Sequence, residues 1–227
     1  MRAHARIVLL AVATAVVLAF ALAVILGRPA ARPATGTSTA GTGASIAENA
    51  RSSSGFDGAL LPGLPAPDFT LSDQHGRRVS LGQYRGRVTI LTFLSTTCHP
   101  TCPLIAQQIR GALDELGHAV RTLIVSADPT ADTPARVRRF LGEAALSGRV
   151  EYLTGTPAEL QRVWRDYNVV PSQLANPNSP HPASVLLIDR LGQERDLFQV
   201  EQLTPEALAH DIRRLQTGST TAEGLIP

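Results

Sequence analysis

Nonpolar residues recur along the central part of the chain with two different periods, and these periods predict strands and helices in alternation. Residues 87–95, RVTILTFLS, form a nearly continuous nonpolar run, which is typical of a strand buried on both faces. Residues 121–128, RTLIVSAD, have the same character. Between these runs, nonpolar residues at 104, 105, 109, 112, 113 and 116 follow helical spacing, and Gly117 is a stop signal. A strand, a helix and a second buried strand are therefore expected here.

Further patterns extend this unit on both sides. Residues 69–81 alternate around Gly76 like a hairpin, and residues 184–199 indicate a strand, a turn at Leu191-Gly192 and a returning strand. Cap residues followed by proline predict three more helices, with Asp132 or Thr133 before Pro134, Thr156 before Pro157 and Thr204 before Pro205. This order predicts an α/β domain over residues 63–217, with a thioredoxin-like fold and an N-terminal hairpin extension.

The first residues of the chain predict a membrane anchor. Residues 7–26, IVLLAVATAVVLAFALAVIL, are uncharged and almost wholly nonpolar, and a helix of this length spans about 30 Å, the hydrocarbon core of a bilayer. Arg2 and Arg6 precede the segment and favour a cytoplasmic N-terminus at residues 1–6. One transmembrane helix at 7–26 would then place the domain on the extracytoplasmic side of the cell membrane. A cleaved signal peptide is the alternative, although its nonpolar region should be shorter, at about 7 to 15 residues.

Two segments flank the predicted domain. Residues 27–62 are rich in Ala, Gly, Ser, Thr and Pro. Such a segment cannot bury enough nonpolar surface to offset the entropy of ordering it, so a flexible linker is predicted between the anchor and the domain. Residues 218–227 are predicted to form a loose tail.

Composition and charge exclude several classes of site. Lys and Arg together number 21, and every one of them is arginine. The absence of lysine excludes a Schiff-base lysine and a phosphate-loop lysine. The net charge is +2, and no basic patch is interleaved with aromatic residues, so the sequence gives no support to nucleic-acid binding.

The only two cysteines, Cys98 and Cys102, lie where the first buried strand is expected to end and the first long helix to begin. A disulfide between them is geometrically possible, but it closes so short a loop that it would stabilise the fold by only about 2 kcal/mol. Cys102 is expected in the first turn of the helix, where free N–H groups and the helix dipole favour a thiolate. The pair can therefore be a structural staple, a redox couple or ligands of a soft metal such as Cu(I). A metal site would need a third ligand from elsewhere in the chain.

Two other features of the predicted domain have simpler interpretations. Asp128 and Asp132 are close enough to suggest a hard-cation site, but such a site needs more oxygen ligands than this stretch offers. Asp132 with Thr133 is instead expected to cap a helix, and Asp128 to make turn hydrogen bonds. Trp164 and Tyr167 are expected to pack on one face of a helix.

Several motifs occur in order through the domain. They are PAPDFTLSDQHGRRVSL, the C-x-x-x-C-P pattern in TFLSTTCHPTCP, VSADPTADTPARVRRFL, LTGTPAEL, and a histidine eight residues before the aspartate of LLID. Together they resemble the Sco/SenC family of membrane-tethered copper proteins, from about residue 65 to residue 215. Members of this family have a thioredoxin-like fold and bind copper through the two cysteines and that histidine. They deliver copper to the dinuclear copper site of cytochrome c oxidase, or keep its cysteines reduced.

The resemblance implies a ligand set, a function and partners. Carried over by position, it makes Cys98 and Cys102 a redox-active pair and the thiolate ligands of copper, and His181 the imidazole ligand. The implied partners are the copper-site subunit of cytochrome c oxidase, or another copper-carrying protein, and a thiol-disulfide reductant. A metallochaperone is expected rather than an enzyme. An extracytoplasmic thiol:disulfide reductase stays open, although typical thioredoxins use C-x-x-C, and so does a noncatalytic partner-binding domain.

The chain departs from the family pattern beside the implied ligands. His99-Pro100 stands between the cysteines where the family commonly has Pro-Asp, and Pro180 stands where an aspartate often precedes the ligand histidine. Pro182 replaces a small polar residue. Loss of a carboxylate there would alter copper affinity or the redox balance of the thiols rather than the ligand set. His99 is expected to be an exposed loop residue or an auxiliary ligand. The other histidines are expected to be solvated, namely His4, His75, His118 and His210.

Overall fold

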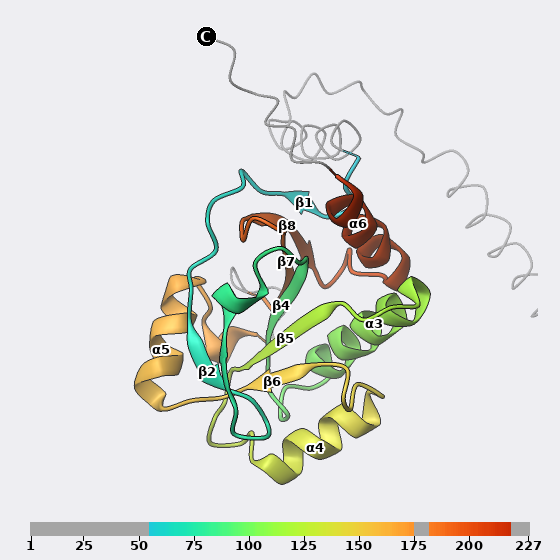
Figure 1. Ribbon diagram of the computed structural model, residues 1–227. Helices are drawn as coiled ribbons and strands as arrows, with labels where there is room; N and C mark the ends of the chain where they lie inside the picture. Colours follow the sequence, from blue (N-terminus) through green and yellow to red (C-terminus); the bar gives the residue numbers. More distant parts are fainter. Residues whose placement is uncertain (1–54, 175–181, 219–227) are drawn as a thin grey trace, which may run out of the picture. The chain divides into compact units, whose positions relative to one another are not determined.

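The structure is a computed structural model that describes residues 55–174 and 182–218. Its main feature is a six-stranded sheet with the order β1-β8-β7-β4-β5-β6 (Figure 1). The pairs β4–β5 and β5–β6 are parallel, while β4–β7, β7–β8 and β8–β1 are antiparallel. The strands are β1 (Ala59–Leu60), β4 (Thr89–Leu94), β5 (Arg121–Ser126), β6 (Glu151–Leu153), β7 (Ser184–Ile188) and β8 (Glu194–Gln199).

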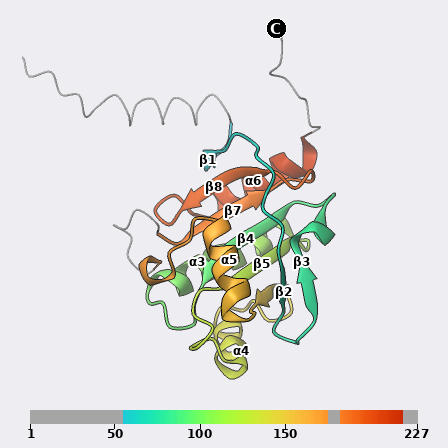
Figure 2. The same ribbon diagram turned by 90° about the vertical axis from the view of Figure 1, so that its left-hand side faces the viewer.

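Helices cover both faces of this sheet. The α-helices are α3 (Thr101–Leu116), α4 (Pro134–Glu143), α5 (Pro157–Asp166) and α6 (Pro205–Thr217), and two short 3-10 helices are η1 (Leu81–Tyr84) and η2 (Pro171–Gln173). α3 and α6 pack against each other on one face, and α5 lies on the other face (Figure 2). A separate hairpin of β2 (Thr70–Ser72) and β3 (Arg78–Ser80) turns at Gly76, whose φ of +80° suits glycine. The predicted α/β arrangement, thioredoxin-like with an N-terminal hairpin, is thus confirmed.

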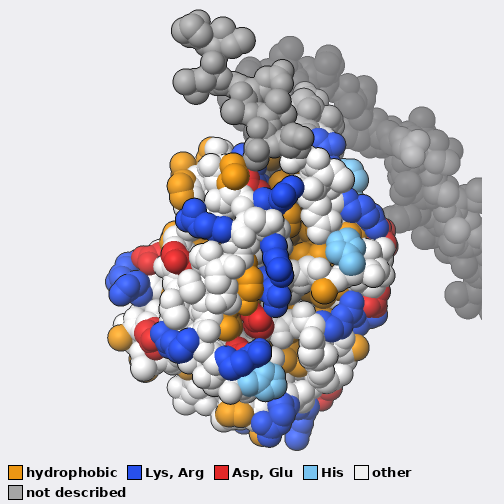
Figure 3. Space-filling model, viewed as in Figure 1, with side chains coloured by type: hydrophobic (Ala, Val, Ile, Leu, Met, Phe, Trp, Pro, Cys, Tyr) orange, Lys and Arg blue, Asp and Glu red, His pale blue; other side chains and the backbone are white. Residues whose placement is uncertain are grey.

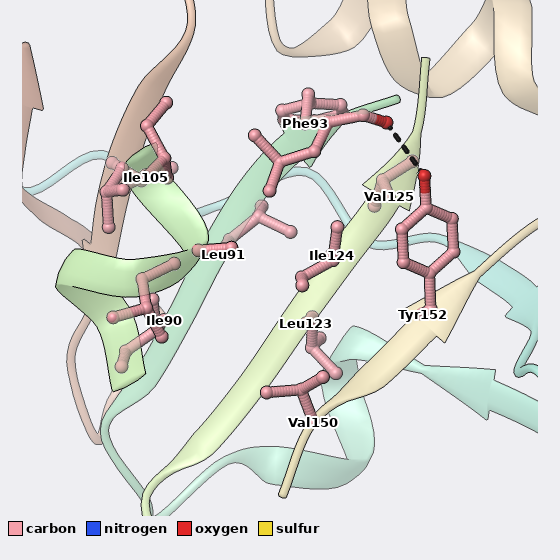
Figure 4. Packing of buried hydrophobic residues seen from close by; sticks show 14 of the residues in the cluster. Ile90, Leu91, Phe93, Ile105, Leu123, Ile124, Val125, Val150 and Tyr152 are labelled. Carbon is pink, nitrogen blue, oxygen red and sulfur yellow. Dashed lines mark hydrogen bonds between the residues drawn. The ribbon is translucent and has the colours of Figure 1, made fainter. Parts of the chain in front are cut away.

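The core is centred on β4 and β5. β4 is buried over its whole length, as the nonpolar run at 87–95 predicts, and Ile90, Leu91 and Leu94 have no exposed surface. Each such side chain contributes roughly 2 kcal/mol to stability by leaving water. Figure 4 shows side chains of β4 and β5 in one cluster with those of Ile105 and Tyr152. The end of β4 is consequently a rigid support for the residues that follow it.

Aromatic residues at the end of α5 complete the packing, Trp164 within the helix and Tyr167 as its C-cap. The indole N–H of Trp164 donates to the Ser126 carbonyl at 3.0 Å. The ring of Tyr167 lies 6.0 Å from that of Phe69 and 5.6 Å from that of Phe93. The packing roles predicted for Trp164 and Tyr167 are therefore confirmed.

The helices begin at the predicted threonine caps. Thr133, Thr156 and Thr204 each accept a backbone N–H of their helix, and Thr156 forms a reciprocal capping box with Glu159. Such a cap stabilises a helix by about 1 kcal/mol. Asp132, the alternative cap for α4, takes no part in capping and has another role, described below.

The N-terminal limit of the domain differs from the sequence-based boundary. The linker predicted over residues 27–62 ends too late, because Ala59 and Leu60 form β1, which pairs with Leu197 and Asp196 of β8. A strand of two residues is too short to produce a visible period. β6, with three residues, was not predicted for the same reason.

The membrane anchor predicted at 7–26, residues 1–6 and most of the predicted linker lie outside the described residues, as do residues 219–227 of the predicted tail. Among the helices within 55–174 and 182–218, none has both the length and the apolar character needed to cross a membrane.

Candidate thiol and metal site

Cys98 and Cys102 are joined by a disulfide at the carboxyl end of β4. Their Cα atoms are 5.5 Å apart. Cys102 lies in the first turn of α3, as predicted, and has no exposed surface, whereas Cys98 lies in the loop before the helix and is 9% exposed. The His99-Pro100 peptide bond between them is cis. Of the two sulfur-bearing residues, Cys98 is thus the one that an incoming group reaches first.

The start of α3 is open to negative charge. Pro100 is the N-cap residue, and no side chain caps the helix. The positive end of the helix dipole therefore acts directly on the Cys102 sulfur, which lies at the second helical position. This placement favours a thiolate when the disulfide is reduced.

The loop that carries Cys98 is held by hydrogen bonds of its own. The Cys98 N–H donates to the Ser95 carbonyl at 3.3 Å, and the Thr97 N–H donates to Ser95 Oγ at 3.2 Å. The hydroxyl oxygens of Ser95 and Thr97 are 2.9 Å apart. These contacts close a tight turn directly after β4.

Asp132 holds this turn in place by hydrogen bonds, which is a different role from the predicted helix cap. Its Oδ1 accepts the Thr96 N–H at 2.7 Å, the Thr96 hydroxyl at 2.8 Å and the Ser95 hydroxyl at 3.3 Å. Its Oδ2 accepts the Ser126 hydroxyl at 2.6 Å and the Tyr152 hydroxyl at 2.7 Å. The carboxylate is 5% exposed, so five donors replace the water that it loses on folding. Asp128 makes the predicted turn bonds with the N–H groups of Ala131 and Asp132.

Tyr152 connects the Asp132 network to the core. Its hydroxyl also lies 3.1 Å from the Leu94 carbonyl at the end of β4, a contact drawn in Figure 4. Burial, followed by the nearby Asp132 carboxylate, holds the pKa of Tyr152 well above its usual value. The phenol therefore remains a hydrogen-bond donor, and β4, β5, β6 and the Cys98 loop are tied to one carboxylate.

The third implied ligand, His181, lies outside the described residues, as does Pro180. The next residues, Pro182 and Ala183, lead into β7, and the Ala183 N–H donates to the Leu174 carbonyl at 3.3 Å. His99 is exposed, as are His75, His118 and His210. His4 lies outside the described residues.

A second group of potential ligands lies at β1 and α6. Asp57, His210 and Asp211 place one ligand atom each within 4.8 Å of one another. Asp211 is fully buried, and its carboxylate accepts the N–H groups of Asp57 and Gly58 at 2.9 and 3.0 Å. His210 Nδ1 lies 2.9 Å from Asp211 and 3.0 Å from Asp57. Protein groups thus account for the contacts of this cluster, which attaches the N-terminal segment to α6.

A family model covers nearly the whole described domain. The family model described as SCO1/SenC matches residues 62–217. "Protein sco1" of Schizosaccharomyces pombe is 26% identical over 105 residues, which is 44% of this chain and 39% of that protein. A Mycobacterium tuberculosis protein named as a candidate peroxiredoxin is 32% identical over 108 residues, or 48% of this chain and 66% of that protein. The chain therefore spans well under half the length of the S. pombe protein.

Solved structures extend the comparison to the fold. BsSco is a member of the Sco family of cytochrome c oxidase assembly proteins, and a disulfide switch was identified in it. It superimposes on this chain with a TM-score of 0.59 at 23% identity, and the match covers 70% of this chain and 96% of BsSco. Bradyrhizobium japonicum ScoI, solved with copper bound, gives a TM-score of 0.51 at 28% identity, covering 66% and 99%. BsSco, at its low identity, supports the fold alone.

Proposed function

Because this chain belongs to the SCO1/SenC family, we propose that it is a copper-binding chaperone that delivers copper to the dinuclear copper site of cytochrome c oxidase or keeps the cysteines of that site reduced. The observation that carries the proposal is the pairing of Cys98 and Cys102 at the open start of α3. Two sulfurs that can bond to each other can also approach one metal ion. Bradyrhizobium japonicum ScoI, which has the same fold, was solved with copper bound.

The disulfide and the copper-loaded state exclude each other. Reduction of the Cys98–Cys102 bond needs two electrons and two protons, which a dithiol partner supplies while forming its own disulfide. The two thiols then release their protons as they bind Cu(I), a soft ion that prefers thiolate sulfur. The start of α3 stabilises the negative charge that this step develops. The redox state of the pair therefore decides whether copper is bound or absent.

We further propose His181 as the third ligand. Its support from the described residues is the register of the sheet: β7 is antiparallel to β4, and Val185 pairs with Thr92. The start of β7 and the end of β4 consequently lie at the same edge of the sheet. His181 comes three residues before β7, and the Cys98 loop comes directly after β4. An imidazole would add the nitrogen donor that Cu(II) prefers.

Replacing histidines tests this ligand set. His181→Ala should remove the defined Cu(II) site of the reduced protein, while Cu(I) can persist on two thiolates. His99→Ala is the matched control, because His99 is exposed and lies between the cysteines. The measurement is the thiolate-to-copper absorption band of each full-length variant. Interchanged effects, with His181→Ala silent and His99→Ala destructive, would move the site onto the loop between the cysteines.

We also propose that residues 7–26 anchor the chain in the cell membrane, with residues 1–6 cytoplasmic and the domain extracytoplasmic. The support is the length and apolar character of the segment. The anchored chain should stay with the membrane fraction during alkaline carbonate washing. A released protein whose first residue lies beyond position 26 would show a cleaved signal instead.

A second candidate function is thiol:disulfide exchange without copper. The disulfide state favours it, because a Cys98 with 9% exposure and a Cys102 with none suit stepwise exchange. A match to a candidate peroxiredoxin points the same way. A reduced protein that reduces disulfides but binds no copper would support this function over the first.

A further inference from the structure

A groove runs between the Cys98 loop, α3 and α4. Its volume is about 620 Å³. The groove is lined by three segments, the loop with Thr97 and His99, the start of α3 with Pro103, and α4 with Arg136, Arg139 and Glu143. Phe140 is buried and packs on Tyr152, the residue that binds Asp132, so one wall is fixed to the same network as the loop. The groove is therefore a preformed surface beside the thiol pair.

Two arginines make this groove attractive to anions. Arg136 and Arg139 are exposed on successive turns of α4. Within residues 55–174 and 182–218, the Arg139 guanidinium has no hydrogen-bond or ion-pair partner, and that of Arg136 donates only to the Ala131 carbonyl, at 3.4 Å. Elsewhere, arginines such as Arg121 and Arg213 pair with carboxylates. Glu143 is the one carboxylate that lines the groove among the described residues.

The groove lies beside the loop of the thiol pair, and Cys98 itself is not among the residues that line it. Cys98 is located between Thr97 and His99, which both line the groove, and it is the more accessible cysteine. A partner thiolate that attacks the Cys98 sulfur forms a mixed disulfide and breaks the Cys98–Cys102 bond. Cys102 leaves as a thiolate at the start of α3, where the helix dipole stabilises it. A second partner thiol then releases Cys98 and completes the partner's disulfide.

We propose that this Arg136–Arg139 groove binds a carboxylate-bearing segment of the protein partner that exchanges thiols with Cys98. The inference rests on the proposed function only in requiring that the thiol pair reacts with a partner. Beyond that function, the proposal specifies the partner as a protein with acidic residues beside its reacting cysteine. Opposite charges on the groove and the partner raise the rate of productive encounter, and this effect weakens as salt screens the charges.

Small thiols of different charge test the groove without a known partner. The oxidised full-length protein is reduced with mercaptoacetate, mercaptoethanol or cysteamine, which are anionic, uncharged and cationic, and each rate is divided by the thiolate concentration. At low ionic strength, the ratio of the mercaptoacetate rate to the cysteamine rate should fall about five-fold in Arg136→Gln/Arg139→Gln. The ratio in the native protein should also fall as salt is added. Glu143→Gln should change it in the opposite direction.

Arg138→Gln is the matched control, since Arg138 is exposed on the same helix but does not line the groove. It should leave the rate ratio within about two-fold of the native value. An equal ratio in the native protein and the double variant would overturn the proposal, as would an Arg138→Gln effect as large as that of the double variant. The mercaptoethanol rate and the copper content of the double variant should stay at native levels. Complete resistance to all three thiols would overturn the thiol chemistry of the proposed function as well, so the two failures are distinguishable.

Discussion

Two regions of this domain bury carboxylates in opposite ways. Beside the thiol pair, Asp132 receives five hydrogen-bond donors. Where β1 joins β8 and α6, Asp196 is fully buried, yet no donor within residues 55–174 and 182–218 bonds to either of its carboxylate oxygens. The backbone lies directly against it, because a Cβ at Gly58 would be 2.3 Å from Asp196 Oδ1.

The difference lies in what compensates each group for lost water. Burial, followed by the nearby Asp211 carboxylate, raises the pKa of Asp196 to about 8. A protonated Asp196 can donate a hydrogen bond to Asp211. This shared proton compensates the Asp196–Asp211 pair for lost hydration, as five donors compensate Asp132. Hydrogen bonds from five donors thus hold the thiol end of the sheet, whereas the attachment of β1 depends on a proton.

Replacing Asp196 should have the largest effect on the free energy of unfolding and on its dependence on pH. The folded state keeps a proton that the unfolded chain releases near the usual aspartate pKa. The free energy of unfolding should therefore fall as pH rises from about 4 to about 8, by up to about 1.4 kcal/mol per pH unit. Asp196→Asn, which keeps a donor toward Asp211, should flatten this slope and be the more stable protein at pH 8. Urea unfolding at a series of pH values measures both, and an unchanged slope would refute the shared proton.

Asp132→Asn should act in the opposite direction. The amide nitrogen cannot accept the hydrogen bonds that one carboxylate oxygen accepts, so buried donors lose their acceptor. We expect the free energy of unfolding to fall by about 3 kcal/mol. Asp128→Asn is the control, because Asp128 is only partly buried, and it should cost less than about 1 kcal/mol. Urea unfolding of the two variants at one pH compares them. Equal losses of unfolding free energy would show that the Asp132 hydrogen bonds contribute no more to stability than those of Asp128.

Tyr152→Phe should have the smallest effect, and it isolates one hydrogen bond of Asp132. It removes one of the five donors without leaving a buried donor unpaired, so a loss of about 1 kcal/mol is expected. Combined with Asp132→Asn, its effect should be less than additive, because both changes remove the same hydrogen bond. A double-mutant cycle by urea unfolding measures this coupling, and strict additivity would contradict the network.

Local patterns were enough to predict most elements of the fold. β4 and β5 are long nonpolar runs, and the three later helices begin at a threonine followed by proline, so neighbouring residues carry the signal. β1 and β6 were missed because they are short and, unlike the three-residue strands β2 and β3, do not flank a glycine turn of a hairpin. The same locality explains why the junction that holds Cys98 and Cys102 could be placed correctly.

The supporting groups of the site could not be predicted in the same way. Asp132 occurs in a polar stretch that suits a helix cap, and its donors come from residues 95–96, 126 and 152. Their convergence depends on the packing of three strands, which no local pattern contains. Asp196 also lies in an ordinary strand sequence, and its burial results from the pairing of β1 with β8.

In the proposed function, one pair of sulfurs either forms a disulfide or binds copper. Its most direct test is a stepwise oxidation of the reduced full-length protein, with free thiols and bound copper counted on the same samples after desalting. The account predicts one copper ion per chain in the fully reduced sample, no copper in the fully oxidised sample, and a proportional fall of the two counts between them. Copper that stays bound after both thiols are lost, or a reduced protein that retains no copper, would contradict it.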